Sequence, residues 1–259
     1  MNHSYQTEKI TTALLLAAGT GSRLGSLTKK MPKCLTKVNG TEILSQLIDC
    51  LRLHNFKRLV IVVGHYELEI RNYLDKIAGD IKVEYIVSSP YKTTNNIYSL
   101  WLAREKIKEP FLLIESDLVF DPSLLEEMLV PDRIAVSHIL RWMNGTTVTT
   151  DDLMPDRVAA FNIGTHLKMN GNTYKTINIY SFSRQSWRQI SKRLDCWVSA
   201  GKVKDYYEAV FAEMVADGNL DFECIYFDRN RWYEIDTVED LHECEKLFIQ
   251  PGHTLPAAV

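Results

Sequence analysis

The chain has 259 residues, with 30 basic and 33 acidic side chains and a formal net charge of −3. This balance lacks the basic footprint of nucleic-acid binding proteins, so we expect no nucleic acid among its partners. Hydrophobic residues make up 46% of the chain, which is enough to build the core of one large α/β domain. No apolar run of eighteen residues and no signal-peptide pattern occurs, so we expect a soluble, cytoplasmic protein without membrane contact.

In the first half, apolar runs alternate with segments of helical periodicity. This alternation is typical of a mostly parallel sheet with helices on both faces. Ligands of such sheets bind beyond the carboxyl ends of the strands. The expected strands cover residues 12–16, 58–63, 82–87 and 111–115, and the expected helices cover residues 42–54, 67–78 and 95–107.

The first expected strand ends in a turn of small residues. Residues 14–23 read Leu-Leu-Leu-Ala-Ala-Gly-Thr-Gly-Ser-Arg. Gly19 and Gly21 permit positive φ and a close ligand approach, so successive backbone N–H groups can form an anion-binding nest. Arg23 and Lys33 add fixed positive charge nearby. This segment therefore predicts a phosphate-binding loop.

Two well-known glycine-rich patterns do not fit this loop. A Walker loop requires Gly-Lys-Ser/Thr, which does not follow here, and the third glycine of a Rossmann fingerprint would fall at Leu24. The segment instead resembles the signature of the sugar-phosphate-type nucleotidylyltransferases, Leu-Ala-Ala-Gly-x-Gly-x-Arg followed by a spacer and Pro-Lys. An ordinary glycine-rich turn is the alternative interpretation. The resemblance implies that the nucleotide is bound by Leu16, Ala17, Ala18, Gly19, Thr20 and Gly21.

A second matching segment lies at residues 93–100, Thr-Thr-Asn-Asn-Ile-Tyr-Ser-Leu. Amide side chains donate and accept hydrogen bonds, which suits a base edge such as that of cytosine, but asparagine also caps helices. The stretch resembles the Asn-Ile-Tyr-Ser segment of the phosphocholine and 2-aminoethylphosphonate cytidylyltransferases, in which the helix start helps to enclose the nucleotide. We expect one of Asn95 and Asn96 to cap the helix and the other to contact the base or ribose.

Two aspartates follow strand-like segments. Asp117 comes directly after the apolar run 111–115, and Asp236 lies within Arg-Trp-Tyr-Glu-Ile-Asp-Thr at residues 231–237. Each has a plain alternative as a turn or helix cap. In the family that the chain resembles, aspartates at these two places coordinate the catalytic magnesium. Mg²⁺ is therefore the expected cofactor, since it needs only one or two carboxylates besides phosphate oxygens and waters.

The pattern becomes irregular after an apolar run at residues 133–139. We expect a small substrate-binding excursion over residues 141–175, with a surface hairpin as the alternative. The core is expected over 11–140 and 176–249, within a single domain at 1–249 and before a flexible tail at 250–259. Inside the excursion, residues 157–163 are strand-like. After it, strands are expected at 176–182 and 222–227, and helices at 185–200, 204–216 and 238–248. The fold class is a Rossmann-like, GT-A-like α/β fold with a mixed, mostly parallel sheet.

An aromatic and acidic group is the candidate acceptor pocket. Trp142, Trp232, Tyr233 and Glu234 would suit a cationic amine through cation–π attraction and ion pairing, although a tryptophan more often packs in a core. The residues around Trp142 resemble those of phosphonate-processing members of the family. They favour a 2-aminoethylphosphonate-like or hydroxyalkylphosphonate acceptor, with phosphocholine next.

The phosphate of the acceptor needs its own positive charge. The Glu-Lys-Pro segment of the hexose-1-phosphate members has no clear copy in this chain. Lys168 or Lys175 could supply the charge, although a lysine is more often merely solvated. Asn178 is expected to face the pocket from a strand.

The resemblance as a whole implies an enzyme that transfers CMP from CTP to a small phosphonate or phosphorylated amino alcohol, with Lys33 and Arg23 as catalytic residues. The alternatives are a hexose-1-phosphate nucleotidylyltransferase, a nucleotide-sugar glycosyltransferase and a non-catalytic nucleotide-binding module. Residues 115–117, Glu-Ser-Asp, lack the Asp-x-Asp pair of many glycosyltransferases. A non-catalytic module would be expected to have lost Lys33 or an aspartate. The sequence leaves open the acceptor, the preference for CTP over UTP or dTTP, and a possible homodimer.

Overall fold

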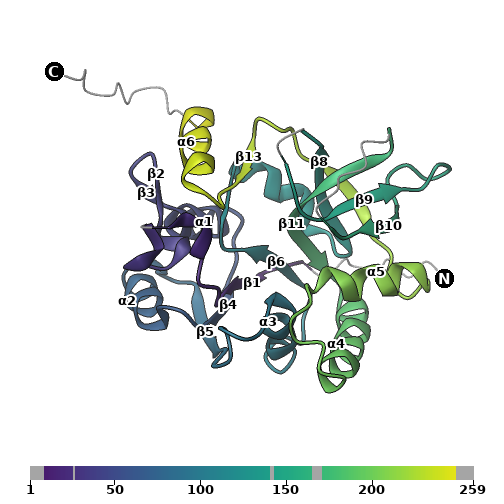
Figure 1. Ribbon diagram of the computed structural model, residues 1–259, viewed down its shortest axis with the longest axis horizontal. Coiled ribbons are helices and arrows are strands. Elements are labelled where there is room, and N and C mark those ends of the chain that lie inside the picture. The colour runs from purple at the N-terminus through teal and green to yellow at the C-terminus, as the bar shows by residue number, and fades with distance from the viewer. Residues whose placement is uncertain (1–8, 26, 141–142, 165–170, 249–259) are drawn as a thin grey trace.

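The computed structural model describes residues 9–25, 27–140, 143–164 and 171–248. Nine strands form one sheet: β1 (Thr12–Ala17), β4 (Arg58–Val63), β5 (Lys82–Val87), β6 (Phe111–Glu115), β8 (Arg133–His138), β9 (Thr147–Thr150), β10 (Val158–Asn162), β11 (Thr173–Phe182) and β12 (Glu223–Tyr226). The main path of the sheet runs β10-β9-β11-β6-β1-β4-β5, and β8 pairs with β11 and β12 (Figure 1).

The sheet is mixed, as predicted. Strands β6, β1, β4 and β5 are parallel, whereas β11 runs antiparallel to β6, β8 and β9. In register, Leu16 of β1 lies beside Val62 of β4 and Glu115 of β6. The carboxyl ends of β1 and β6 are therefore adjacent, and the residues that follow them, the glycine loop and Asp117, share one edge of the sheet.

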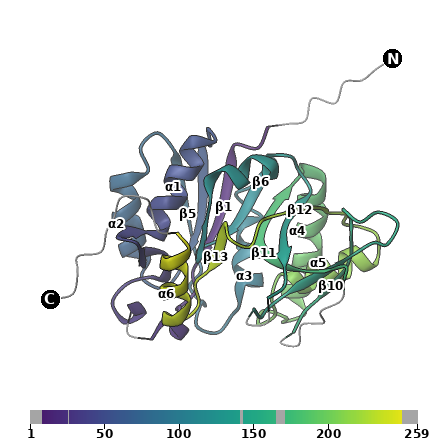
Figure 2. The ribbon, with the colours of Figure 1, turned by 90° about the horizontal axis from the view of Figure 1, so that it is seen from above.

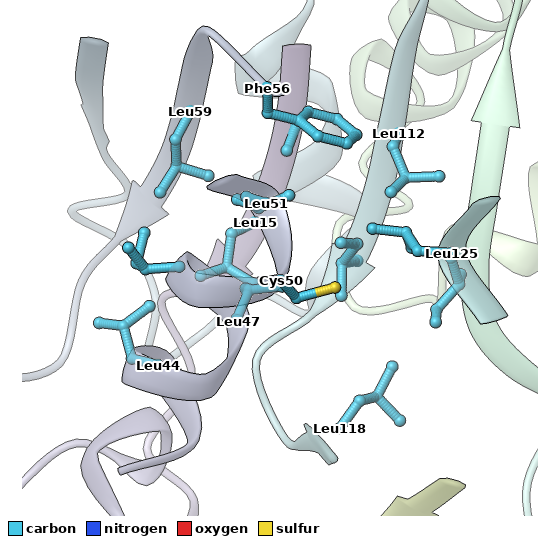
Figure 3. Close-up of a cluster of buried hydrophobic side chains, with 14 of the residues drawn as sticks. Leu15, Leu44, Leu47, Cys50, Leu51, Phe56, Leu59, Leu112, Leu118 and Leu125 are labelled. Carbon is cyan, nitrogen blue, oxygen red and sulfur yellow. The ribbon is translucent and has the colours of Figure 1, made fainter. Parts of the chain in front are cut away.

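The strand β1 is buried along its whole length because helices cover both faces of the sheet. Ala13, Leu15 and Ala17 face the helices α1 (Ile43–Leu53) and α2 (Glu67–Ile77), and Figure 3 shows Leu15 among the leucines of α1. The alternate residues Leu14 and Leu16 face the opposite cluster. That cluster includes the helices α3 (Asn96–Ala103), α4 (Arg184–Ser199) and α5 (Glu208–Ala216) (Figure 2). Burial on both faces explains why this strand is a continuous apolar run.

A small two-stranded sheet holds the two candidate metal-binding segments together. In it β7 (Leu118–Phe120) pairs antiparallel with β13 (Trp232–Glu234), and the backbone N–H of Ile235 donates to the carbonyl of Asp117 at 3.0 Å. The helix α6 (Val238–Leu247) follows directly. The remaining elements are β2 (Lys37–Val38), β3 (Thr41–Glu42) and four 3₁₀ segments, Ser22–Leu24, Leu27–Lys29, Lys33–Leu35 and Pro122–Leu129.

Several boundaries differ from the sequence predictions. The last turn of the predicted helix 95–107 is missing, since α3 ends at Ala103, and the predicted helix 204–216 begins only at Glu208. The predicted excursion contributes β9 and β10 to the edge of the main sheet, and β9 was not predicted. The predicted tail at 250–259 lies outside the described residues.

Within the described residues, no helix is long and apolar enough to cross a membrane. All five cysteines are free thiols.

Candidate active site

A cleft of about 700 Å³ opens at the carboxyl ends of β1 and β6. It lies between the glycine loop, the start of α3, the residues just before β9 and just after β10, the strand β11, the start of α5 and the segment after β13. Most of the residues that the sequence singled out line this cleft: Leu16, Ala18, Gly19, Thr20, Gly21, Arg23, Lys33, Asn95, Asn96, Asp117, Lys175, Asn178, Glu234 and Asp236. One cavity therefore gathers residues that are up to 220 positions apart in the chain.

The other predicted site residues lie elsewhere. The side chain of Ala17 points into the apolar cluster below β1 because neighbouring strand residues face opposite sides. The expectation that Trp232 and Tyr233 form a pocket wall is corrected, because β13 runs between two apolar clusters and buries one of these side chains in each. Trp142 and Lys168 lie outside the described residues.

The glycine loop packs against the catalytic candidate Lys33. Gly21 has φ +61°, and a Cβ there would lie 3.1 Å from Lys33 Cβ and 3.2 Å from Thr28 Cγ2. A larger residue would thus meet both strain and crowding at this position. Gly19 differs from the expectation, because its φ is not positive and a Cβ there would meet nothing within 4 Å. Gly19 nevertheless lines the cleft.

Lys33 joins the two aspartates. Its Nζ donates to Asp117 Oδ2 at 2.6 Å and to Asp236 Oδ1 at 2.7 Å, and all three side chains are less than one-fifth exposed. Burial alone would lower the pKa of Lys33, but the two carboxylates outweigh it and hold that pKa above its ordinary value. The ammonium group therefore stays charged. The exposed Arg23 adds a further ion pair, from Nη1 to Asp236 Oδ2 at 2.7 Å.

The capping of a helix or turn, which was the alternative interpretation for Asp117 and Asp236, is performed by neighbouring residues. Thr237 caps α6 in a capping box with Asp240, so the side chain of Asp236 is free to face the cleft. In the same way, Asp121 caps the 3₁₀ segment Pro122–Leu129, which leaves Asp117 at the end of its strand. Both aspartates are thus available for charge interactions in the cleft.

The two aspartates also fit a divalent cation. They are close enough to share the single Nζ of Lys33, and Asp117 Oδ1 is buried without a hydrogen-bond partner among the described residues. Within the same residues, no group of three or more His, Cys, Asp and Glu side chains is arranged for a metal ion. A two-carboxylate site is what Mg²⁺ accepts when phosphate oxygens and waters complete its coordination.

The two asparagines at the start of α3 have different partners. Asn95 is the cap, because its Oδ1 accepts a hydrogen bond from the backbone N–H of Asn96 at 2.8 Å. The Oδ1 of Asn96 accepts from the backbone N–H of Tyr207 at 3.1 Å, and its Nδ2 donates to Glu115 Oε1 at 3.3 Å. Asn96 therefore ties α3 to the end of β6 and to the start of α5. A contact from either asparagine to a base stays a prediction.

The far end of the cleft contains a buried lysine. Lys175 is 2% exposed, and its Nζ donates to the carbonyl of Thr176 at 2.7 Å and lies 3.4 Å from Glu234 Oε2. Asn178 reaches Glu234 Oε1 at 3.4 Å from a backbone with φ +60°, at a register shift of β11 between Thr176 and Tyr180. Such irregularities redirect side chains next to functional sites. Lys175 is hence a cleft residue and is not merely solvated.

Two glutamates of the cleft were not predicted as site residues. Burial raises the pKa of Glu115, at the end of β6, well above its usual range. Glu208, the first residue of α5, is 4% exposed, and its Oε2 has no hydrogen-bond partner among the described residues. No local sequence pattern marks Glu208, because its burial depends on where α5 packs against the sheet.

We expect Glu208→Gln to stabilise the protein at alkaline pH. Burial raises the pKa of Glu208 to about 7 from an ordinary value of 4.5. The folded state therefore binds more protons than the unfolded state between these values, so the stability contributed by this group falls as pH rises through that window. At pH 8 the variant should exceed the parent in unfolding free energy by about 3 kcal/mol, and near pH 4 by little. Urea denaturation at both pH values measures this; equal stabilities at pH 8 would contradict it.

Comparisons with known proteins bear on the family and the fold. Residues 13–136 match the model of the MobA-like NTP transferase domain. These residues, just under half of the chain, are similar to a nucleotidyltransferase family. The resemblance inferred from the glycine loop and from Pro-Lys is thereby confirmed.

Proteins similar to this chain include two enzymes that are named for phosphonates. CMP-5'-(3-aminopropyl)phosphonate synthase of Streptomyces rubellomurinus is 30% identical over 254 residues, which cover 92% of this chain. The chain spans only 39% of that relative's length. The 2-aminoethylphosphonate cytidylyltransferase of Lancefieldella rimae is 25% identical over 89% of this chain and 90% of its own.

Solved structures support the fold. CTP:phosphocholine cytidylyltransferase from Streptococcus pneumoniae superposes with a TM-score of 0.79 and 22% identity, covering 92% of this chain and 99% of the other. The predicted GT-A-like, Rossmann-type fold class is thereby confirmed.

Proposed function

We propose that this protein is a Mg²⁺-dependent cytidylyltransferase that transfers CMP from CTP to a small phosphonate or phosphorylated amino alcohol and releases pyrophosphate. The observation that carries the proposal is the Lys33 bridge between Asp117 and Asp236, beside the glycine loop in one cleft. The names of the phosphonate relatives support the choice of nucleotide and of acceptor class.

The backbone of the glycine loop and the side chains of the cleft supply most of what the transfer needs. The reaction requires an α-phosphorus held in line with the attacking oxygen and a neutralised charge. The glycine loop and Arg23 are suited to hold the triphosphate. Two of the three Nζ–H donors of Lys33 serve the aspartates, which leaves the third for an oxygen on the α-phosphorus. Magnesium bound by Asp117 and Asp236 would neutralise further phosphate charge.

The transfer needs no protein base. An oxygen of the phosphonate forms a bond to the α-phosphorus of CTP, the bond from that phosphorus to the bridging oxygen breaks, and pyrophosphate leaves. A phosphate-type dianion is already deprotonated near neutral pH, since its second pKa is about 6. Lys175, at the far end of the same cleft, is the buried cation best suited to hold the acceptor's phosphonate group.

Pyrophosphate release measured with CTP, UTP, ATP and dTTP, each against a panel of acceptors, tests the proposal. We expect turnover with CTP and with 2-aminoethylphosphonate, 3-aminopropylphosphonate or phosphocholine, and none with glucose 1-phosphate. Turnover with hexose 1-phosphates alone would show that the acceptor is a sugar phosphate and not a phosphonate or a phosphorylated amino alcohol. Hydrolysis of a nucleotide sugar would favour a glycosyltransferase. Tight CTP binding without pyrophosphate release would point to a non-catalytic module.

A further inference from the structure

Glu208 has a carboxylate oxygen that no described residue satisfies. The side chain lines the cleft and is 4% exposed, yet among residues 9–25, 27–140, 143–164 and 171–248 its Oε2 has no hydrogen-bond partner. A buried polar atom without a partner costs free energy, and a buried carboxylate costs more than a neutral group. Native structures contain few such atoms. The unpaired oxygen destabilises the fold, so a ligand-binding role explains its presence better than a role in folding does.

The surroundings of Glu208 carry an excess of acid. Glu115, Glu208 and Glu234 all line the cleft, and Lys175 is the cation that acts on both Glu208 and Glu234. Lys175 already donates to the carbonyl of Thr176 and faces Glu234 Oε2 at 3.4 Å. Lys175 therefore pairs with Glu234, and its Nζ does not donate a hydrogen bond to Glu208. The free oxygen of Glu208 therefore needs a donor that the described residues do not supply.

The free oxygen also indicates the kind of cation. A carboxylate oxygen accepts from N–H or O–H donors and pairs most strongly with a charged one; a primary ammonium provides three charged N–H donors, whereas a trimethylammonium provides none. Of the three aromatic residues predicted to suit a quaternary ammonium, Trp232 and Tyr233 are packed in apolar clusters, and Trp142 lies outside the described residues. An acceptor with a methyl group in place of the ammonium would leave Oε2 unpaired.

We propose that Glu208 accepts a hydrogen bond from a primary ammonium group of the acceptor, so that the cleft selects aminoalkylphosphonates over neutral and quaternary-ammonium acceptors. This inference rests on the proposed function and adds a specificity-determining residue to it. Glu208 binds the ammonium group, and the neighbouring Lys175 holds the phosphonate of the same short acceptor.

Matched acceptors and an isosteric variant test this role. The acceptors are 2-aminoethylphosphonate and 3-aminopropylphosphonate, their methyl analogues propylphosphonate and butylphosphonate, and the N-trimethyl form of 2-aminoethylphosphonate. With the parent protein, CTP and Mg²⁺, we expect kcat/KM for the better amino acceptor to exceed that of its methyl analogue by about 100-fold. In Glu208→Gln this ratio should fall to about 10 or less, with the KM for CTP within about twofold of the parent. Glu69→Gln, an exposed acid on α2, is the control that should keep the parent ratio.

The outcomes separate the two proposals. A ratio in Glu208→Gln equal to that of the parent overturns the role of Glu208. Equal use of amino and methyl acceptors, or of the trimethyl form, by the parent overturns the selection of primary ammonium while CMP transfer stands. If the parent releases no pyrophosphate with any of these acceptors, the proposed function itself fails.

Discussion

Replacing Lys33 with methionine is expected to lower kcat for pyrophosphate release by about 10²–10³-fold, because loss of one charge aimed at a developing negative charge typically has that effect. Methionine keeps much of the length and the apolar stem of lysine but carries no charge. It also leaves Asp117 and Asp236 facing each other without the cation that joins them. Steady-state kinetics with saturating CTP and acceptor measures the effect.

A control variant distinguishes a loss of catalysis in Lys33→Met from a loss of folded protein. Lys37→Met removes a lysine whose side chain is 61% exposed and whose partner Glu42 lies outside the cleft. It should leave kcat within about twofold of the parent, as exposed ion pairs contribute little. Far-ultraviolet circular dichroism should show the same helix and strand content in both variants. Full turnover in a folded Lys33→Met protein would remove Lys33 from the reaction.

The second large effect is expected from Asp117→Asn and Asp236→Asn. Each replacement keeps the shape of the side chain and removes one of the two carboxylates that share Lys33. We expect kcat to fall by about 100-fold or more in each, since metal-assisted charge stabilisation is worth several kcal/mol. The Mg²⁺ concentration for half-maximal rate should rise as well, because fewer negative charges remain to hold the ion.

Titration of the rate with MgCl₂, after removal of metal with a chelator, measures both quantities. The matched control is Asp75→Asn, on the exposed side of α2, which should change neither. Parent-like rates in both aspartate variants, or a parent rate that survives complete chelation, would show that these carboxylates do not hold a catalytic metal.

The parts of the site that follow local rules were predictable from sequence. The apolar run of β1 and the turn at Gly21 follow from burial on both faces and from backbone geometry, and each is encoded within a few residues. Asp117 was placed correctly at the cleft because parallel strands end at a common edge. The cap by Thr237 explains how Asp236 can face the cleft at a helix start.

The parts that depend on distant pairing were not predictable. Trp232 looked like a pocket residue because it lies near Asp236, but pairing of β13 with β7 directs it into the core. Glu208 looked like an ordinary helical acid, since its exposure depends on where α5 packs against the sheet. The left-handed backbone at Asn178 likewise follows from the register shift between β11 and β8, which no local pattern encodes.

Direct detection of the product is the decisive measurement. The protein is incubated with CTP, Mg²⁺ and 2-aminoethylphosphonate or 3-aminopropylphosphonate, and the phosphorus nuclei are followed by NMR. We expect one phosphonate–phosphate anhydride to form for each pyrophosphate released, with both signals absent when Mg²⁺ is chelated. Consumption of CTP without an anhydride signal from any phosphonate or phosphocholine, or no consumption at all, would contradict cytidylyl transfer in this cleft.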